Sequence, residues 1–496
     1  MAKTARVLAV SSTIVKLWVR EVASATGTSI RTVKVGAGVS LVLASFLGAL
    51  LALVAASHLE GDIPSELRAA ALRTSFSGAA LTGGAIGVVL CMSVPSRTAL
   101  QNLIDLLPID RVTARLGQIV PLFTAGLVYS LALSMSGIAI VVRTTTSVWI
   151  AVGGVAAYIA LVIVALAFSI GVFSVAQYAS ARLLRLPPQY AATLGGAAAL
   201  VITLAATVPD ILSSQPVLEF TWGIGEVLPA RVFAWVAYGQ PGAIIGATLW
   251  GAVAASLVWF GAKLRTPSSR NRQPRWLHGM KPLGRSAGWG HVWFEMLIAV
   301  RNPQFTMTVL LVPATLGGVY ALTLVPAVSA LAGQLGLSVA VFPMMLALYS
   351  GGRTLPSAWV GRVVGSTTAV RVIAKSIAIV MTSGLLSCCI ATVLLASRLV
   401  QPADLGDLVA RCVLALGLAL AVGTLIPYSE QQPLSIVAGG FVLAVGYLLI
   451  TLSVGMGTQG LAPGTSTAIL LAAALAALGA YALLSARALR AGPVRA

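Results

Sequence analysis

The sequence predicts an all-α membrane protein with about twelve transmembrane helices, arranged as two parallel six-helix repeats with both termini in the cytoplasm. Of its 496 residues, 58% are hydrophobic and only 9% are charged, and the mean hydropathy is +0.96. These values lie far outside the range of soluble globular domains. The apolar residues gather into long runs, and the basic residues fall in the gaps between them.

Twelve apolar runs are long enough to cross about 30 Å of hydrocarbon as helices. The predicted spans cover residues 35–57, 77–94, 117–142, 148–176, 190–208, 241–260, 305–328, 336–352, 376–397, 408–427, 434–454 and 466–486.

The central interval 262–304 fixes the orientation of these spans. It carries eight lysines and arginines against a single acid, Glu295. Basic intervals between spans stay in the cytoplasm. Alternating the sides from there places 26 of the 32 basic residues in the cytoplasm, which supports twelve spans with both ends inside. Because these cations lie in short gaps between spans, they do not indicate a nucleic-acid partner.

Each half is expected to open with an amphipathic helix lying in the membrane surface. The chain is predicted to begin with a cytoplasmic N-terminus that holds the first amphipathic helix (1–34), followed by a first six-helix transmembrane half (35–261). A basic cytoplasmic linker that holds the second amphipathic helix (262–304) leads to a second six-helix transmembrane half (305–487) and a cytoplasmic tail (488–496). The apolar stripes of the two amphipathic helices are Ile14, Leu17, Trp18 and Ala25, then Trp289, Val292, Trp293, Met296, Leu297 and Val300.

The cytoplasmic segments after the second span of each half, 96–115 and 353–375, occupy matching places and precede a long span. They are either ordinary basic loops or docking segments that offer charges to a cytoplasmic partner. The candidate docking residues are Asp105, Asp110, Arg111 and Arg115 in the first segment, and Arg362, Arg371 and Lys375 in the second.

The outer segment 215–240 is too polar and too rich in proline and glycine to span, but Val232, Phe233 and Trp235 belong to a short apolar helix within it. That helix is either an anchor at the lipid interface or a lid over an exit pathway. Polar residues inside the spans either line a cavity or make hydrogen bonds between helices. They include Tyr129, Ser134, Tyr158, Tyr320, Tyr349 and Thr382.

Several classes of chemistry are disfavoured. No ionisable residue lies well inside a predicted span, whereas proton-coupled carriers usually place one there. No lysine follows a glycine in a phosphate-binding loop pattern, so we expect this chain not to hydrolyse ATP by that chemistry. The cysteines and histidines show no metal-site spacing. We expect no catalytic residue, cofactor or metal in the chain.

Three short motifs carry a resemblance to a known family. They are Arg301-Asn302-Pro303 before the seventh span, Leu107-Pro108-Ile109-Asp110 before the third, and Leu228-Pro229 before the sixth. Together with the surface helices, they resemble the type-2 export permeases of ATP-binding cassette (ABC) transporters, in a fused twelve-helix form. The second half departs from this pattern, because Val364-Gly365-Ser366 replaces the Leu-Pro motif. The two halves are therefore expected to be functionally unequal.

The resemblance implies a permease subunit in a bacterial plasma membrane that exports a hydrophobic or amphipathic compound, such as a drug, lipid or peptide. A separate cytoplasmic ATPase, in two copies, would bind ATP and Mg²⁺. The two predicted surface helices of this chain correspond to the elbow helices of that family. Two alternatives stay open. One is a secondary carrier of the major facilitator type. The other is a membrane-embedded glycosyltransferase that uses Glu60, Asp62 and Glu66 of the first outer loop.

Overall fold

The computed structural model describes residues 2–26, 29–57, 65–93, 110–145, 147–212, 227–264, 286–323, 329–354, 366–427, 434–458 and 464–490. Within these ranges all regular elements are helices and no strand occurs. The chain divides into two compact units: unit 1 comprises residues 1–20 and 29–271, and unit 2 comprises residues 21–28 and 272–496.

Ten helices within the described residues are long and apolar enough to cross a membrane. This confirms a multi-pass helical protein. The ten segments are Ile30–Leu53, Arg68–Met92, Val112–Leu133, Val148–Leu183, Tyr190–Thr207, Pro241–Lys263, Leu335–Gly352, Thr368–Ala396, Pro402–Leu425 and Thr465–Arg487.

Each of these ten segments overlaps a predicted span. The other two predicted spans, 305–328 and 434–454, fall on α12 (Pro303–Thr323) and α19 (Leu434–Gly457). Both are helical but are not among the ten, so the count of twelve and the repeat stay predictions.

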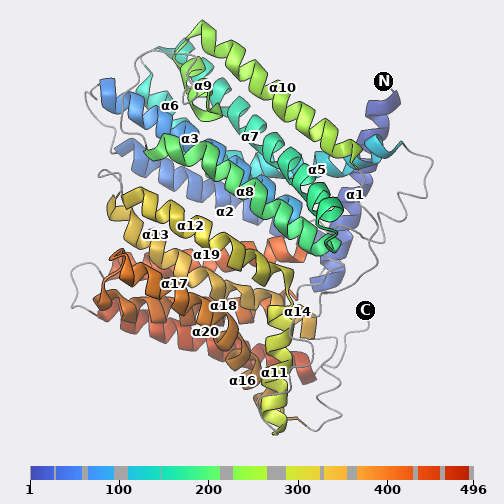
Figure 1. Ribbon diagram of the computed structural model, residues 1–496, viewed down its shortest axis with the longest axis vertical. Coiled ribbons are helices and arrows are strands. Elements are labelled where there is room, and N and C mark those ends of the chain that lie inside the picture. The colour runs from blue at the N-terminus through green and yellow to red at the C-terminus, as the bar shows by residue number, and fades with distance from the viewer. Residues whose placement is uncertain are drawn as a thin grey trace. The chain divides into compact units, whose positions relative to one another are not determined.

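Unit 1 is built around its long central helix (Figure 1). This is α7 (Val148–Leu183), which packs against α3 (Ser65–Ser93), α8 (Pro188–Leu212), α9 (Pro229–Ala237) and α10 (Pro241–Lys263). Because α7 is apolar around its whole circumference, it is stable only where neighbours cover it. The remaining helices of the unit are α1 (Ala2–Thr26, up to Arg20), α2 (Ile30–Ser57), α5 (Arg111–Leu133) and α6 (Met135–Thr144).

The predicted third span, 117–142, is two helices in the structure. The α-helix α5 ends before Ser134, and α6 begins at Met135. The buried Tyr158 hydroxyl donates to the Ser134 carbonyl at 3.2 Å, and a side chain at Gly137 would collide with the Tyr158 ring. The break therefore accommodates a tyrosine from α7, and the membrane-length part of the prediction shortens to Val112–Leu133.

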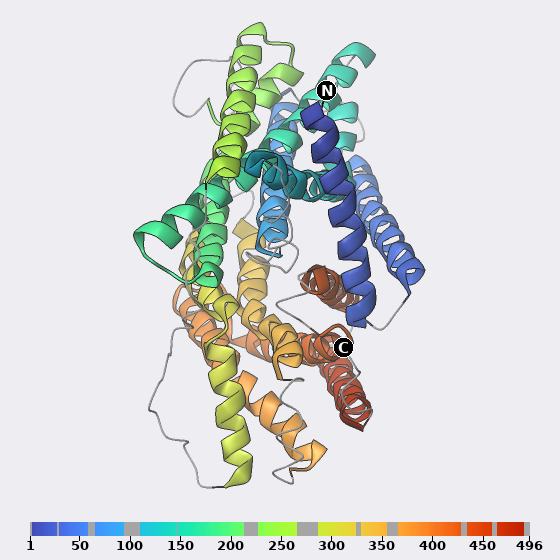
Figure 2. The ribbon, with the colours of Figure 1, turned by 90° about the vertical axis from the view of Figure 1, so that its right-hand side faces the viewer.

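Unit 2 is centred on α18 (Leu405–Leu425), which packs against α19, α20 (Thr465–Arg490) and η1, a 3₁₀ helix at Phe342–Tyr349. The Leu, Ala and Gly residues of α18 supply much of the unit's buried core. Near one end of the unit, α11 (Ala287–Val300) runs beside α16 (Thr368–Ile379) in both views (Figure 1, Figure 2).

Two predicted spans of unit 2 are not uniform α-helices. The predicted span 336–352 consists of α13 (Ser329–Val341), then η1, then α14 (Ser350–Thr354). The predicted span 376–397 begins in α16, passes through a π turn, η3 (Val380–Gly384), and continues as α17 (Leu385–Ala396). A short 3₁₀ turn, η4 (Pro402–Asp404), then leads into α18. The change at residue 342 has a local cause: Pro343 has no N–H, and its ring disfavours a continuous α-helix.

Candidate functional site

The Arg-Asn-Pro motif acts as a helix stop followed at once by a helix start. After α11 ends at Val300, the buried Asn302 side chain accepts a hydrogen bond from the Gln304 backbone N–H at 3.1 Å. Pro303 then occupies the first position of α12, where its missing N–H costs nothing. The motif therefore sets the place where α11 ends and α12 begins.

One face of α11 is packed and another is open. Val292 is buried against Ala374 and Ala378 of α16, whereas Trp289 and Phe294 are about half exposed. At the start of α11 the Ser286 side chain caps the helix by accepting from the Trp289 N–H. This packing joins α11 to the helix in which the second candidate docking segment ends.

An ion pair crosses the same contact. Lys375 Nζ of α16 lies 3.7 Å from Glu295 Oε1 of α11, and the two side chains are only 12% and 14% exposed. Lys375 Nζ also donates to the Ser350 carbonyl oxygen at 3.3 Å. Burial raises the pKa of Glu295 above its ordinary value, and the charge of Lys375 acts in the opposite direction. Lys375 thus links α11, α16 and the first residue of α14.

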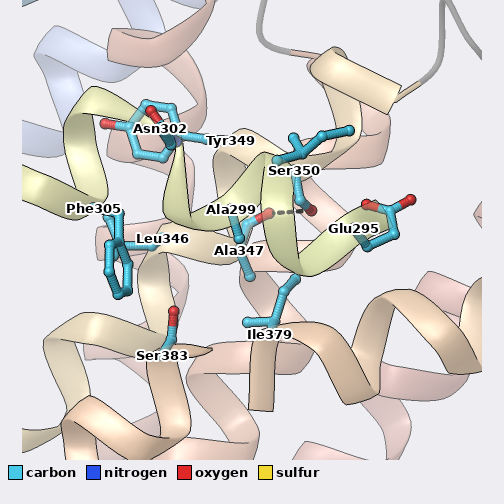
Figure 3. A pocket seen from close by; sticks show the side chains of 11 residues that line it. Glu295, Ala299, Asn302, Phe305, Leu346, Ala347, Tyr349, Ser350, Ile379 and Ser383 are labelled. Atoms are coloured by element: carbon cyan, nitrogen blue, oxygen red, sulfur yellow. Dashed lines mark hydrogen bonds between the residues drawn. The ribbon is translucent and has the colours of Figure 1, made fainter. Parts of the chain in front are cut away.

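A pocket lies beside this ion pair (Figure 3). Its polar lining comes from Glu295 of α11, Asn302, Tyr349 of η1, Ser350 of α14 and Ser383 of the π turn. The Ser350 hydroxyl donates to the Ala347 carbonyl at 2.7 Å. The other lining residues are apolar. Hydroxyl groups and one carboxylate in an apolar setting can bind a small polar group. Among the described residues no set of three or more His, Cys, Asp or Glu side chains gathers to hold a metal.

The predicted docking residues differ in their burial and in their hydrogen-bond partners. Lys375 is mostly buried within unit 2, where it makes the contacts described above. Arg371 donates to the Ser366 hydroxyl at 2.9 Å and to the Ser366 carbonyl at 3.2 Å, and Arg115 donates to Gln118. Asp110 is exposed and directly precedes α5.

The remaining docking residues are not placed as side chains. Arg111 is the first residue of α5 and only its backbone is described, while Asp105 and Arg362 lie outside the described residues.

The predicted outer helix is α9, and its three candidate residues are buried. Val232, Phe233 and Trp235 are 1%, 4% and 9% exposed, and α9 packs against α3, α7 and α10. The Trp250 indole N–H donates to the Val227 carbonyl at 2.7 Å, which ties α10 to the residues before α9. A surface anchor would leave such side chains exposed to lipid, so this burial favours a helix inserted into the bundle.

The six candidate cavity residues are not brought to one place. Tyr158 and Ser134 meet in the core of unit 1, and Tyr129 hydrogen-bonds Ser40 of α2. In unit 2, Tyr320 is exposed, and the Thr382 hydroxyl is buried and donates to the Ala378 carbonyl. Only Tyr349 lines the pocket.

Sequence reasoning did not identify Glu295 as a site residue. The available signal was that Glu295 is the one acid among eight bases in the central interval and lies on the surface helix. Comparisons with known protein families, with curated proteins and with solved structures find no match to this chain.

Proposed function

We propose that this multi-pass membrane protein is the permease subunit of an ABC-type exporter in a bacterial plasma membrane, driven by two copies of a separate cytoplasmic ATPase. One observation carries the proposal. In each unit, the helix before the first predicted span contacts the helix in which a candidate docking segment ends. In unit 1, Ser11 of α1 donates to the Gly117 carbonyl of α5 at 3.0 Å. In unit 2, Glu295 of α11 pairs with Lys375 of α16.

These contacts suit the transmission of force. A partner that moves the segments before α5 and α16 would move those helices and the surface helices attached to them as single bodies. The proposed repeat then gives the two units equivalent input points. The cargo we propose is hydrophobic or amphipathic, because the ionisable residues of the predicted spans lie near their ends, leaving no central charge to bind a polar ion.

The first test is co-purification of the full-length tagged protein in mild detergent from its native host, followed by an ATPase assay. We expect a cytoplasmic ATPase to co-purify in stoichiometric amount. The paired variant D110A/R111A should weaken its retention, since Asp110 is exposed and directly precedes α5. The control variant is R398A, which removes an exposed cation that the predicted topology places on the opposite side.

Two results would count against the proposal. If no ATPase co-purifies from cells that carry the native neighbouring genes, the carrier and the glycosyltransferase become the better explanations. If R398A releases the ATPase as well as D110A/R111A does, the docking residues are assigned to the wrong side.

A further inference from the structure

Two adjacent helices of unit 2 depart from the α-helix in opposite directions. The eight residues of η1 (Phe342–Tyr349) are wound as a 3₁₀ helix, and the five residues of η3 (Val380–Gly384) form a π turn. A 3₁₀ helix is overwound and rarely runs beyond three or four residues, and π turns occur often at functional positions. Within the described part of unit 1, α3 and α5 are α-helical throughout.

The two segments contact each other beside the pocket. A Cβ atom at Gly384, the last residue of the π turn, would lie 3.3 Å from the end of the Met344 side chain in the 3₁₀ run. Leu346, Ala347 and Tyr349 of the 3₁₀ run line the same pocket as Ser383 of the π turn. A change of winding in one segment would therefore displace residues of the other segment.

The end of the 3₁₀ run meets α18 through backbone as well as through buried side chains such as that of Leu348. Gly351 lies against the Gly423 carbonyl of α18, and a Cβ at Gly423 would lie 2.5 Å from the Leu348 carbonyl oxygen. At this point the glycines let the two backbones approach closely.

Lys375 is a cation that reaches across these elements. It lies on the helix that runs into the π turn, and its ammonium group binds the carbonyl of Ser350 immediately after the 3₁₀ run. The same ammonium group binds Glu295 on α11. A single side chain thus fixes the end of the 3₁₀ run relative to the start of the π-containing helix.

We propose that the 3₁₀ run and the π turn together form a hinge in unit 2, and that Lys375 holds it closed by binding Ser350 and Glu295 at once. Eight residues span about 16 Å as a 3₁₀ helix and about 12 Å as an α-helix, so rewinding the run would move Ser350 by about 4 Å. The hinge is a property of unit 2 alone, and does not depend on an ATPase partner.

Amide hydrogen exchange of the full-length protein in lipid nanodiscs tests this proposal. In K375M, exchange within residues 342–354 and 380–384 should become at least about tenfold faster, since local opening of the hinge exposes those amides. Exchange within α18 should not change. The matched control is R411M, which breaks the Arg411–Asp407 ion pair near the start of α18 and the Arg411 hydrogen bond to Tyr447 of α19, in place of the two bonds of Lys375.

A second variant tests the hinge without breaking the ion pair. P343A restores an N–H and removes the proline ring, so the 3₁₀ run can rewind as an α-helix. Exchange in 342–349 should slow, and exchange in the π turn should change with it. The acceleration caused by K375M should be lost in P343A/K375M.

Three results would overturn the proposal. They are unchanged exchange of both segments in K375M, an equal acceleration throughout unit 2, and a P343A variant in which the π turn keeps its wild-type exchange.

Discussion

The two units attach the helix before their first span in different ways. In unit 1 the contact is neutral: the Ser11 hydroxyl donates to the Gly117 carbonyl, and Val10 occupies the space that Gly117 leaves. In unit 2 the contact is a largely buried ion pair between Glu295 and Lys375. The helix that receives the contact ends at the break before Ser134 in unit 1, and in unit 2 it runs into a π turn.

This difference indicates that the ion pair has a role in positioning rather than in stability. Burying two charges costs free energy, and the attraction between them offsets only part of that cost. Such pairs therefore add little to stability but specify one geometry. A rise in the pKa of Glu295 despite the nearby lysine is consistent with that cost. Unit 1 therefore has the simpler attachment, and unit 2 has the one that can be released.

The largest expected effect comes from filling the backbone contact on which the hinge rests. A Cβ at Gly423 would meet the Leu348 carbonyl, which cannot move aside as a side chain can. G423A should destabilise the protein by about 3 kcal/mol, the upper part of the usual range for overpacking. Thermal unfolding in detergent measures this. The control G406A, on the same helix, places its Cβ at an ordinary 3.7 Å from Thr467 and should be neutral. Equal effects would show that α18 does not press on the 3₁₀ run.

The next largest effect should come from reversing the ion pair. E295K and K375E each bring like charges together in a poorly hydrated place, and each should cost about 2 kcal/mol. The double variant E295K/K375E should recover most of the loss. It cannot recover the hydrogen bond from Lys375 to the Ser350 carbonyl. A double variant that loses as much as the two single variants combined would mean that the two charges do not interact.

The sequence predicts the helical membrane fold well because hydropathy is a local property. Ten predicted spans coincide with membrane-length helices among the described residues. That residues 287–300 form a helix was also predictable, from the apolar stripe and from the Asn302-Pro303 pair that starts the next helix, and the place of this helix in the membrane surface stays a prediction.

What the sequence could not predict depends on partners far away in the chain. The break at Ser134 follows from a tyrosine of α7. The sequence predicts Lys375 as a candidate docking residue and gives no sign of its pairing with Glu295, because that pairing is a tertiary contact. Pro343 did offer a local signal for the irregular winding of its span, yet the eight-residue length of the 3₁₀ run depends on how unit 2 packs around it.

The neutral attachment of unit 1 should respond more weakly. S11A removes a buried hydrogen bond and should cost about 1 kcal/mol. G117A forces the Val10 side chain aside and should cost a similar amount. Because both act on one contact, the double variant should lose less than the sum. The control is S12A, since Ser12 is exposed and bonds only to Ala9 of its own helix. Thermal unfolding of S11A should show the same loss at low and at high salt. A salt-dependent loss would contradict a neutral contact.

The smallest expected effect is a pH dependence that only unit 2 should show. Burial raises the pKa of Glu295 above its ordinary value of 4.5, so the folded protein binds this proton more tightly than the unfolded chain does. The group therefore contributes most to stability below pH 4.5, and the contribution is lost as pH rises through the folded-state pKa. E295Q imitates the protonated acid at every pH. It should be slightly more stable than the wild type at pH 7, and the difference should shrink as the pH falls.

Thermal unfolding of the wild type and of E295Q between pH 4 and pH 8 measures that difference. The main control has to account for the ionisable groups that lie near Glu295. Lys375 of α16 and Tyr481 of α20 interact electrostatically with Glu295. His291 lies one turn earlier on α11, so the comparison is repeated in an H291Q background. If the wild type is the more stable protein at pH 7 in both backgrounds, the ion pair stabilises unit 2 outright, and the contrast drawn between the two attachments fails.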